Sequence, residues 1–139
     1  AQTVILTRME GRTPVPDGEK LRDLARHGAT LVLYLSIGLI DRVVAELLDG
    51  YASDTPVAVV QRAWCPDQII LRGSLADIAA TVKAARMRAQ ALIMVGPVFH
   101  LDLRKTWDRK SKLYDPQFSH GFRGAARGRD EGADTEATA

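Results

Sequence analysis

Apolar residues along the chain fall into short runs that alternate with stretches of helical spacing. The runs at residues 31–33, 56–61 and 91–95 are almost wholly apolar, which is typical of strands covered on both faces. Residues 3–8 (TVILTR) are rich in β-branched side chains and predict a first strand. Residues 68–72 alternate weakly and predict a strand antiparallel to the preceding one, because the connection between them is too short for a crossover.

Three stretches between these strands predict helices. Apolar residues recur at helical spacing in residues 18–27 and, most strongly, in residues 40–48, where they follow the i, i+3, i+4, i+7, i+8 pattern of one buried face. The third helix is expected to start at Ser74, because Ser74 and Asp77 match a capping box that follows a turn at Gly73.

The resulting order, β-α-β-α-β-β-α-β, predicts an α/β fold. We expect a sheet of about five strands, mostly parallel with one antiparallel pair, flanked by helices. The length of 139 residues fits one domain, and 46% hydrophobic residues are enough for a core. We expect this domain to cover residues 1–123, whereas residues 124–139 hold Gly, Ala and charged residues with no apolar period and predict a disordered tail.

Residues 29–38 (ATLVLYLSIG) are the centre of this arrangement. The strand ends in a short bend before the next helix, and ligands in open α/β sheets bind at the carboxyl ends of strands. We therefore expect residues 34–38 to form one wall of a ligand cleft. Ala63, just after the strand at residues 56–61, is a second candidate because its small side chain would let a ligand approach the main chain. A plain β-turn is the alternative at that position.

Charged and aromatic residues indicate a possible partner surface only near the C-terminus. The net charge is +2, which does not favour a polyanion-binding protein. Residues 100–129 hold eight Lys or Arg against three Asp, and residues 113–123 (LYDPQFSHGFR) add three aromatic side chains. These aromatic residues favour a C-terminal arm docked on the fold. Nucleic-acid binding is the less favoured alternative, so we expect no nucleic-acid partner.

No catalytic or metal-binding motif stands out. The chain lacks a P-loop, a G-x-G-x-x-G loop and a G-x-S-x-G elbow, and its three histidines and Cys65 are too scattered to predict a metal site. The single cysteine excludes an internal disulfide and fits a cytoplasmic protein. No apolar run approaches the roughly 20 residues that cross a bilayer. The chain starts without Met in a strand-like run, which predicts a piece of a longer protein.

Five segments together resemble the tetrapyrrole methylase family over about residues 1–123: TVILTRMEGRTPVP, TLVLYLSIGLID, PVAVVQRAWCPDQIILRGSLADIA, ALIMVGPV and SKLYDPQFSHGFR. The YLS step and the FSHGFR ending are the most specific. The resemblance implies a two-domain α/β protein in which S-adenosylmethionine lies between the domains and its methyl group passes to a ring carbon of a carboxylate-rich tetrapyrrole, a precorrin. This chain resembles only the second, C-terminal domain, because the Gly-rich G-x-G-x-G-D loop of the first has no match here.

The resemblance also implies cofactor contacts at Tyr34, Leu35, Ala63 and Ala91. Leu35 stands where the family usually has Met, and we expect the exchange to matter little because the contact is through the main chain. The sequence assigns no catalytic residue. Since the sulfonium is already a strong electrophile, the protein has to orient the reactants and exclude water.

We assign the substrate's carboxylates to Arg8, Arg12 and Arg123, since guanidinium groups match carboxylates. Solvated charges beside a turn are the alternative at Arg8 and Arg12. The resemblance further implies a missing N-terminal domain and a homodimer. The alternative function is a binding or dimerisation module of the same fold that has no catalytic activity.

Overall fold

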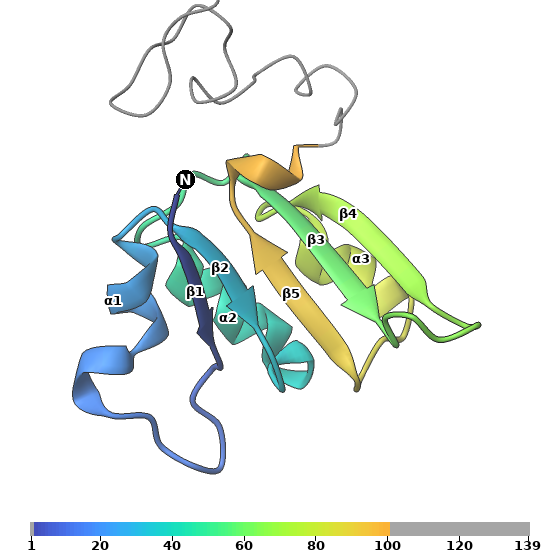
Figure 1. Ribbon diagram of the computed structural model, residues 1–139, viewed down its shortest axis with the longest axis horizontal. Helices are drawn as coiled ribbons and strands as arrows, with labels where there is room; N and C mark the ends of the chain where they lie inside the picture. The colour runs from blue at the N-terminus through green and yellow to red at the C-terminus, as the bar shows by residue number, and fades with distance from the viewer. Residues whose placement is uncertain (1, 101–139) are drawn as a thin grey trace, which may run out of the picture. The chain divides into compact units, whose positions relative to one another are not determined.

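The computed structural model describes residues 2–100, which contain a five-stranded sheet and three α-helices (Figure 1). The strands are β1 (Val4–Thr7), β2 (Thr30–Leu33), β3 (Pro56–Gln61), β4 (Ile69–Ser74) and β5 (Ala91–Val95), in the spatial order β1-β2-β5-β3-β4. The α-helices are α1 (Leu21–Ala25), α2 (Ile40–Leu47) and α3 (Ile78–Ala84). Three 3₁₀ segments are η1 (Asp17–Glu19), η2 (Ile37–Leu39) and η3 (Pro97–Phe99). The expected domain end at residue 123 and tail at 124–139 lie outside the described residues.

The mixed five-stranded sheet confirms the predicted α/β class, but the prediction of mostly parallel pairing is wrong. Of the four strand pairings, β1 with β2 is parallel, whereas β5 runs antiparallel to both β2 and β3, and β4 runs antiparallel to β3. The helical connections preserve strand direction, as expected. The β3–β4 hairpin reverses it, and β5 then inserts between β2 and β3 instead of extending an edge, so it opposes both neighbours.

The predicted turn at Gly73 and helix start at Ser74 are also wrong. Gly73 pairs with Val57 inside β4, and α3 begins only at Ile78. The carboxylate Oδ1 of Asp77 accepts hydrogen bonds from the Ser74 main-chain N–H at 2.7 Å and from its hydroxyl at 3.2 Å. The Ser–Asp pair therefore forms, but it closes the turn ahead of the helix, because pairing with β3 keeps the chain extended through Ser74.

The core lies between the sheet and the helices, and in Figure 1 helices α2 and α3 lie behind the strands. Alternate strand residues face it and are buried: Leu31, Leu33, Val57, Val59, Ile93 and Val95. Helix α2 adds Ile40, Val43 and Leu47, the face that its periodicity predicts. No α-helix of residues 2–100 covers the sheet face turned to the viewer in Figure 1, and on β1 the side chains of Val4 and Leu6 are exposed.

A buried tyrosine joins the end of α2 to the start of β2. The hydroxyl of Tyr51 donates a hydrogen bond to the carbonyl oxygen of Ala29, and the residue is 8% exposed. Burial raises the pKa of Tyr51 above its ordinary value of 10.0, because the phenolate would lose its solvation. The folded protein thus favours the neutral phenol.

Tyr51→Phe should lower the free energy of unfolding of this chain by about 1–2 kcal/mol near neutral pH, because the Ala29 carbonyl loses its buried donor. Above about pH 10 the unfolded chain ionises Tyr51 before the folded protein does, so this residue makes the unsubstituted protein less stable as pH rises. The difference in stability between the two proteins should therefore shrink above that pH. Urea unfolding from about pH 8 to about pH 11 measures it, and a constant or widening difference would contradict the role of the phenol.

Gly50 should prove intolerant of a side chain, because it packs directly on the end of α1. A Cβ at Gly50 would lie 2.3 Å from the carbonyl carbon of Ala25 and 2.4 Å from its oxygen. Gly50→Ala should lower the free energy of unfolding by about 1–3 kcal/mol, measured by urea unfolding. Gly18→Ala is the matched control, since its Cβ would meet nothing within 4 Å. Equal losses in the two variants would show that close approach is not what Gly50 provides.

Candidate functional site

A cleft of about 510 Å³ opens at the edge of the sheet where β2 and β3 end and β5 begins. Because β5 is antiparallel to both neighbours, its first residues lie beside their last ones: Ala91 pairs with Gln61, and Ile93 with Leu33. Three segments line the cleft, namely the bend after β2, the turn after β3 and the connection from α3 to β5. They contribute, among others, Tyr34, Leu35, Gly38, Ala63, Gln90 and Ala91.

The four cofactor positions that the family resemblance implies meet in this cleft. Tyr34 and Leu35 line one wall, Ala63 a second and Ala91 a third. The expected ligand cleft at residues 34–38 therefore coincides with a cavity, and two loop bends far apart in sequence open into the same space. This placement is what a shared ligand requires, and the roles of the four residues in binding stay a prediction.

The chain turns sharply at each wall of the cleft. Leu35 has φ 53°, Gln90 has φ 54°, and Ala63 is flanked by Arg62 at φ 50° and Trp64 at φ 65°. These are left-handed conformations that cost residues other than glycine about 1–3 kcal/mol each, and such strain gathers at functional sites. Sequence reasoning missed these bends, because no Gly or Asn marks them, although four of the five non-glycine residues with positive φ in residues 2–100 lie here.

The buried hydroxyl of Ser36 stabilises the bend after β2, which forms the first wall of the cleft. Ser36 is 0% exposed, and its Oγ accepts a hydrogen bond from the Met9 N–H at 2.8 Å and donates one to the Tyr34 carbonyl oxygen at 2.7 Å. The Tyr34 N–H in turn donates to the Thr7 carbonyl oxygen at 3.0 Å. The bend after β2 is therefore bonded to the start of the loop after β1. The sequence placed Ser36 in the specific YLS step but gave it no role.

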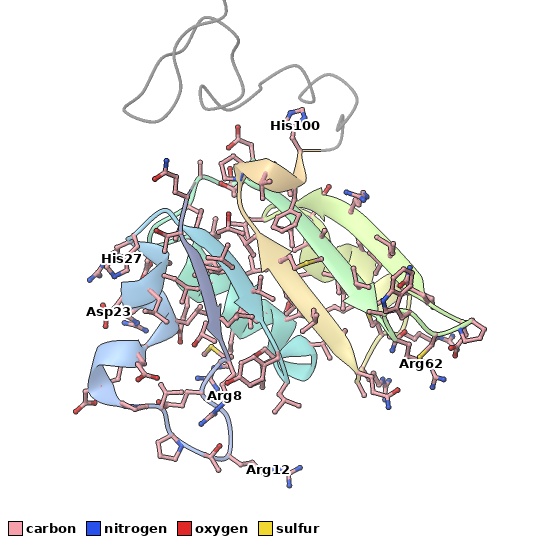
Figure 2. All side chains as sticks on the ribbon, in the orientation of Figure 1. Arg8, Arg12, Asp23, His27, Arg62 and His100 are labelled. Atoms are coloured by element: carbon pink, nitrogen blue, oxygen red, sulfur yellow. The ribbon has the colours of Figure 1, made fainter. Side chains whose placement is uncertain are left out.

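Two of the three predicted substrate arginines, Arg8 and Arg12, lie at the same sheet edge, outside the cleft. Arg8 follows β1 and donates from Nη1 to the Thr13 carbonyl oxygen at 3.1 Å and from Nη2 to that of Pro14 at 2.8 Å. Arg12 is exposed and extends away from the sheet (Figure 2). Arg123 lies outside the described residues. The structure therefore brings Arg8 and Arg12 into one loop and shows that the first already braces that loop.

Within residues 2–100, the cleft is lined mostly by apolar residues and by one charged side chain, Arg88, which sequence reasoning did not single out. Among the described residues, no carboxylate, His or Cys lines the cleft. Cys65 is a free and exposed thiol. Within residues 2–100 no three His, Cys, Asp or Glu side chains gather to hold a metal ion. No helix in that part of the chain is both long and apolar enough to cross a membrane. A cleft lined mostly by apolar residues can hold and orient a small ligand through main-chain groups.

Residues 1–79 match the family model of the Tetrapyrrole (Corrin/Porphyrin) Methylases. The cobalt-precorrin-4 C(11)-methyltransferase of Methanocaldococcus jannaschii is 50% identical over 124 residues, which are 88% of this chain and 46% of the relative. The precorrin-4 C(11)-methyltransferase of Pseudomonas aeruginosa is 46% identical over 123 residues, 88% of this chain and 48% of the relative. The chain thus spans about half the length of the curated relatives it matches.

Two solved structures are similar in fold. A cobalt precorrin-4 methyltransferase of cobalamin biosynthesis superposes with a TM-score of 0.67 at 48% identity, over 68% of this chain and 40% of that one. The uroporphyrin-III C-methyltransferase of Thermus thermophilus, in complex with S-adenosylhomocysteine, has a TM-score of 0.59 at 26% identity, over 73% of this chain and 42% of that one. These likenesses confirm the fold that the sequence resemblance implied.

Proposed function

This chain belongs to the tetrapyrrole (corrin/porphyrin) methylases, and we propose that it is one domain of an S-adenosylmethionine-dependent methyltransferase of corrin biosynthesis. The proposed reaction is methyl transfer to carbon 11 of precorrin-4, the reaction for which relatives 50% and 46% identical to this chain are named. The chain is the second domain of that enzyme, and activity requires the first.

The observation that carries the proposal is the convergence of three main-chain bends on one cleft. Its volume of about 510 Å³ lies in the range of roughly 300–1,000 Å³ that small ligands and cofactors occupy. Ala63 and Ala91 are small enough to let a nucleoside reach the main chain, and Val60 and Leu92 offer apolar surface to a flat ring. S-adenosylmethionine fits these requirements. We assign it to the walls formed by Tyr34 with Leu35, by Ala63 and by Ala91.

The lining suits methyl transfer, in which the protein need not act as acid or base. Bound S-adenosylmethionine supplies a methyl group activated by the sulfonium, and the ring carbon of the precorrin is electron-rich. The cleft residues have to fix the two reactants in line and exclude water. Orientation of this kind can lower a barrier by about 7–11 kcal/mol, which suits a site whose described wall holds no carboxylate, His or Cys.

Two exposed apolar side chains support a further domain over the cleft. Leu35 is 83% exposed, and Trp64, next to Ala63, is 99% exposed. Large apolar side chains that are exposed on a folded domain are typical of a surface that contacts another protein surface. We also propose, from the family resemblance, that the complete enzyme is a cytoplasmic homodimer. The free thiol of Cys65 is compatible with a reducing compartment.

Calorimetry with S-adenosylhomocysteine tests the division of the site between two domains. This chain alone should give no detectable heat, because it holds only part of the cofactor site. The complete protein that carries this chain should bind the same compound with micromolar affinity and add one methyl group to precorrin-4 or cobalt-precorrin-4, detected by mass spectrometry.

The opposite outcomes have separate meanings. Micromolar binding by this chain alone would contradict the shared site. A complete protein that binds the tetrapyrrole but never methylates it would contradict the enzymatic proposal and favour the non-catalytic binding module.

Filling the second wall should weaken cofactor binding. In the complete protein, Ala63→Leu should raise the dissociation constant of S-adenosylhomocysteine about tenfold or more, because the new side chain occupies the space beside the main chain. Its stability should not change, since Ala63 is exposed. Ala52→Leu is the matched control, at an exposed residue before β3 that does not line the cleft. Equal affinities in the two variants would contradict the assignment of Ala63.

A further inference from the structure

The loop after β1 and the cleft wall after β2 form one hydrogen-bonded unit. We call residues 8–14 the arginine loop, because it holds Arg8 and Arg12. Its second residue, Met9, is 3% exposed and donates its main-chain N–H to the hydroxyl of Ser36, which lies 27 residues further along the chain. The same hydroxyl donates to the carbonyl oxygen of Tyr34 in the cleft wall. One buried oxygen atom thus joins the loop to the wall.

The two arginines of the loop differ in what they already contact. The guanidinium of Arg8 reaches across the base of the loop to the carbonyl oxygens of Thr13 and Pro14, so it closes the loop on itself. Arg12 makes no hydrogen bond or ion pair within residues 2–100, and Figure 2 shows it at the outer end of the loop. The loop is therefore pre-formed, and of these two cations Arg12 is the one left to meet a ligand.

We propose that Ser36 is a positioning residue that holds the arginine loop against the cofactor cleft, so that Arg12, and not Arg8, contacts a carboxylate of the tetrapyrrole. Arg8 then has the role of bracing the loop. The inference rests on the proposed methyltransferase function. It adds that the hydrogen bonds of Ser36 fix the position of the arginine loop, which would bind the substrate, relative to the cleft, which would bind the cofactor.

A hydroxyl suits this position because it accepts one hydrogen bond and donates another at the same time. Alanine at residue 36 would do neither and would leave the Met9 N–H buried without an acceptor. Moving the loop outward would return that N–H to water, and Arg12 would move with it. The bend at Leu35 is held in addition by the Tyr34 N–H, which bonds to Thr7, so the cofactor wall should persist.

The test uses the complete protein and separates substrate binding from cofactor binding. Ser36→Ala should raise the KM for the precorrin about tenfold and change the dissociation constant of S-adenosylhomocysteine less than about twofold. Ser36→Thr keeps a hydroxyl and should restore most of the affinity for the precorrin. Ser74→Ala is the matched control: its hydroxyl also bonds within a turn, to Asp77, but β4 places it at the opposite edge of the sheet. It should leave KM unchanged.

A double-mutant cycle shows whether Ser36 acts through Arg12. Arg12→Ala alone should raise the KM for the precorrin, and adding Ser36→Ala to it should raise KM little further, because the cation being positioned is gone. An unchanged KM in Ser36→Ala, additive effects of the two substitutions, or an equal rise in Ser74→Ala would each overturn the inference. Failure of the proposed function differs from all of these, because it would appear as absent methylation by the unsubstituted protein.

Discussion

The site depends on the insertion of β5 between β2 and β3, where it forms hydrogen bonds with both. Ile93 pairs with Leu33 on one side and Val59 on the other, and it is only 1% exposed. Burial of each such side chain contributes about 1.5–3 kcal/mol, so this placement of β5 is stabilised by the same residues that make the core. Because β5 opposes its neighbours, its amino end lies between their carboxyl ends. Three loops from distant parts of the chain therefore surround one cleft.

That cleft offers main-chain groups more than reactive side chains. The left-handed bends at Leu35, at Arg62 with Trp64, and at Gln90 turn the backbone sharply around the cavity. In the part of the chain that the structure describes, Arg88 is the one charged side chain of the lining. A cleft of this kind is consistent with a sequence that has no catalytic motif, although the chain belongs to a family of enzymes. Main-chain groups are common to all residues, so a cleft that offers mainly such groups has no residue pattern by which a sequence could reveal it.

The sequence predicted local structure well where the signal itself was local. The bounds of β3 and β5 match the apolar runs 56–61 and 91–95, because Pro, Gly and polar residues delimit both. Strand direction could not be read in this way, since periodicity is the same for a strand running either way, and only the hairpin and the inserted β5 decide it. Gly73 resembled a turn, but pairing with Val57 overrode its local preference.

For the candidate site, the end of the central strand and the small Ala63 could be predicted, because each follows an apolar run. The assignment of these positions to a cofactor came from family resemblance. Ser36 could not be recognised as a link, because its partner Met9 is distant in sequence and a buried hydroxyl has no local signature. The bracing role of Arg8 was hidden for a related reason: its acceptors are main-chain carbonyl oxygens, which every residue has.

The two ends of the strands in this sheet carry different features. The edge with the cleft also holds the arginine loop, whereas the opposite edge holds the buried phenol of Tyr51 on Ala29 and the turn closed by Ser74 and Asp77. Substitutions at the second edge would remove contacts that stabilise the fold, whereas substitutions at the first would change the cleft and the arginine loop beside it. The stability of this scaffold and the shape of its cleft can therefore change largely independently of each other.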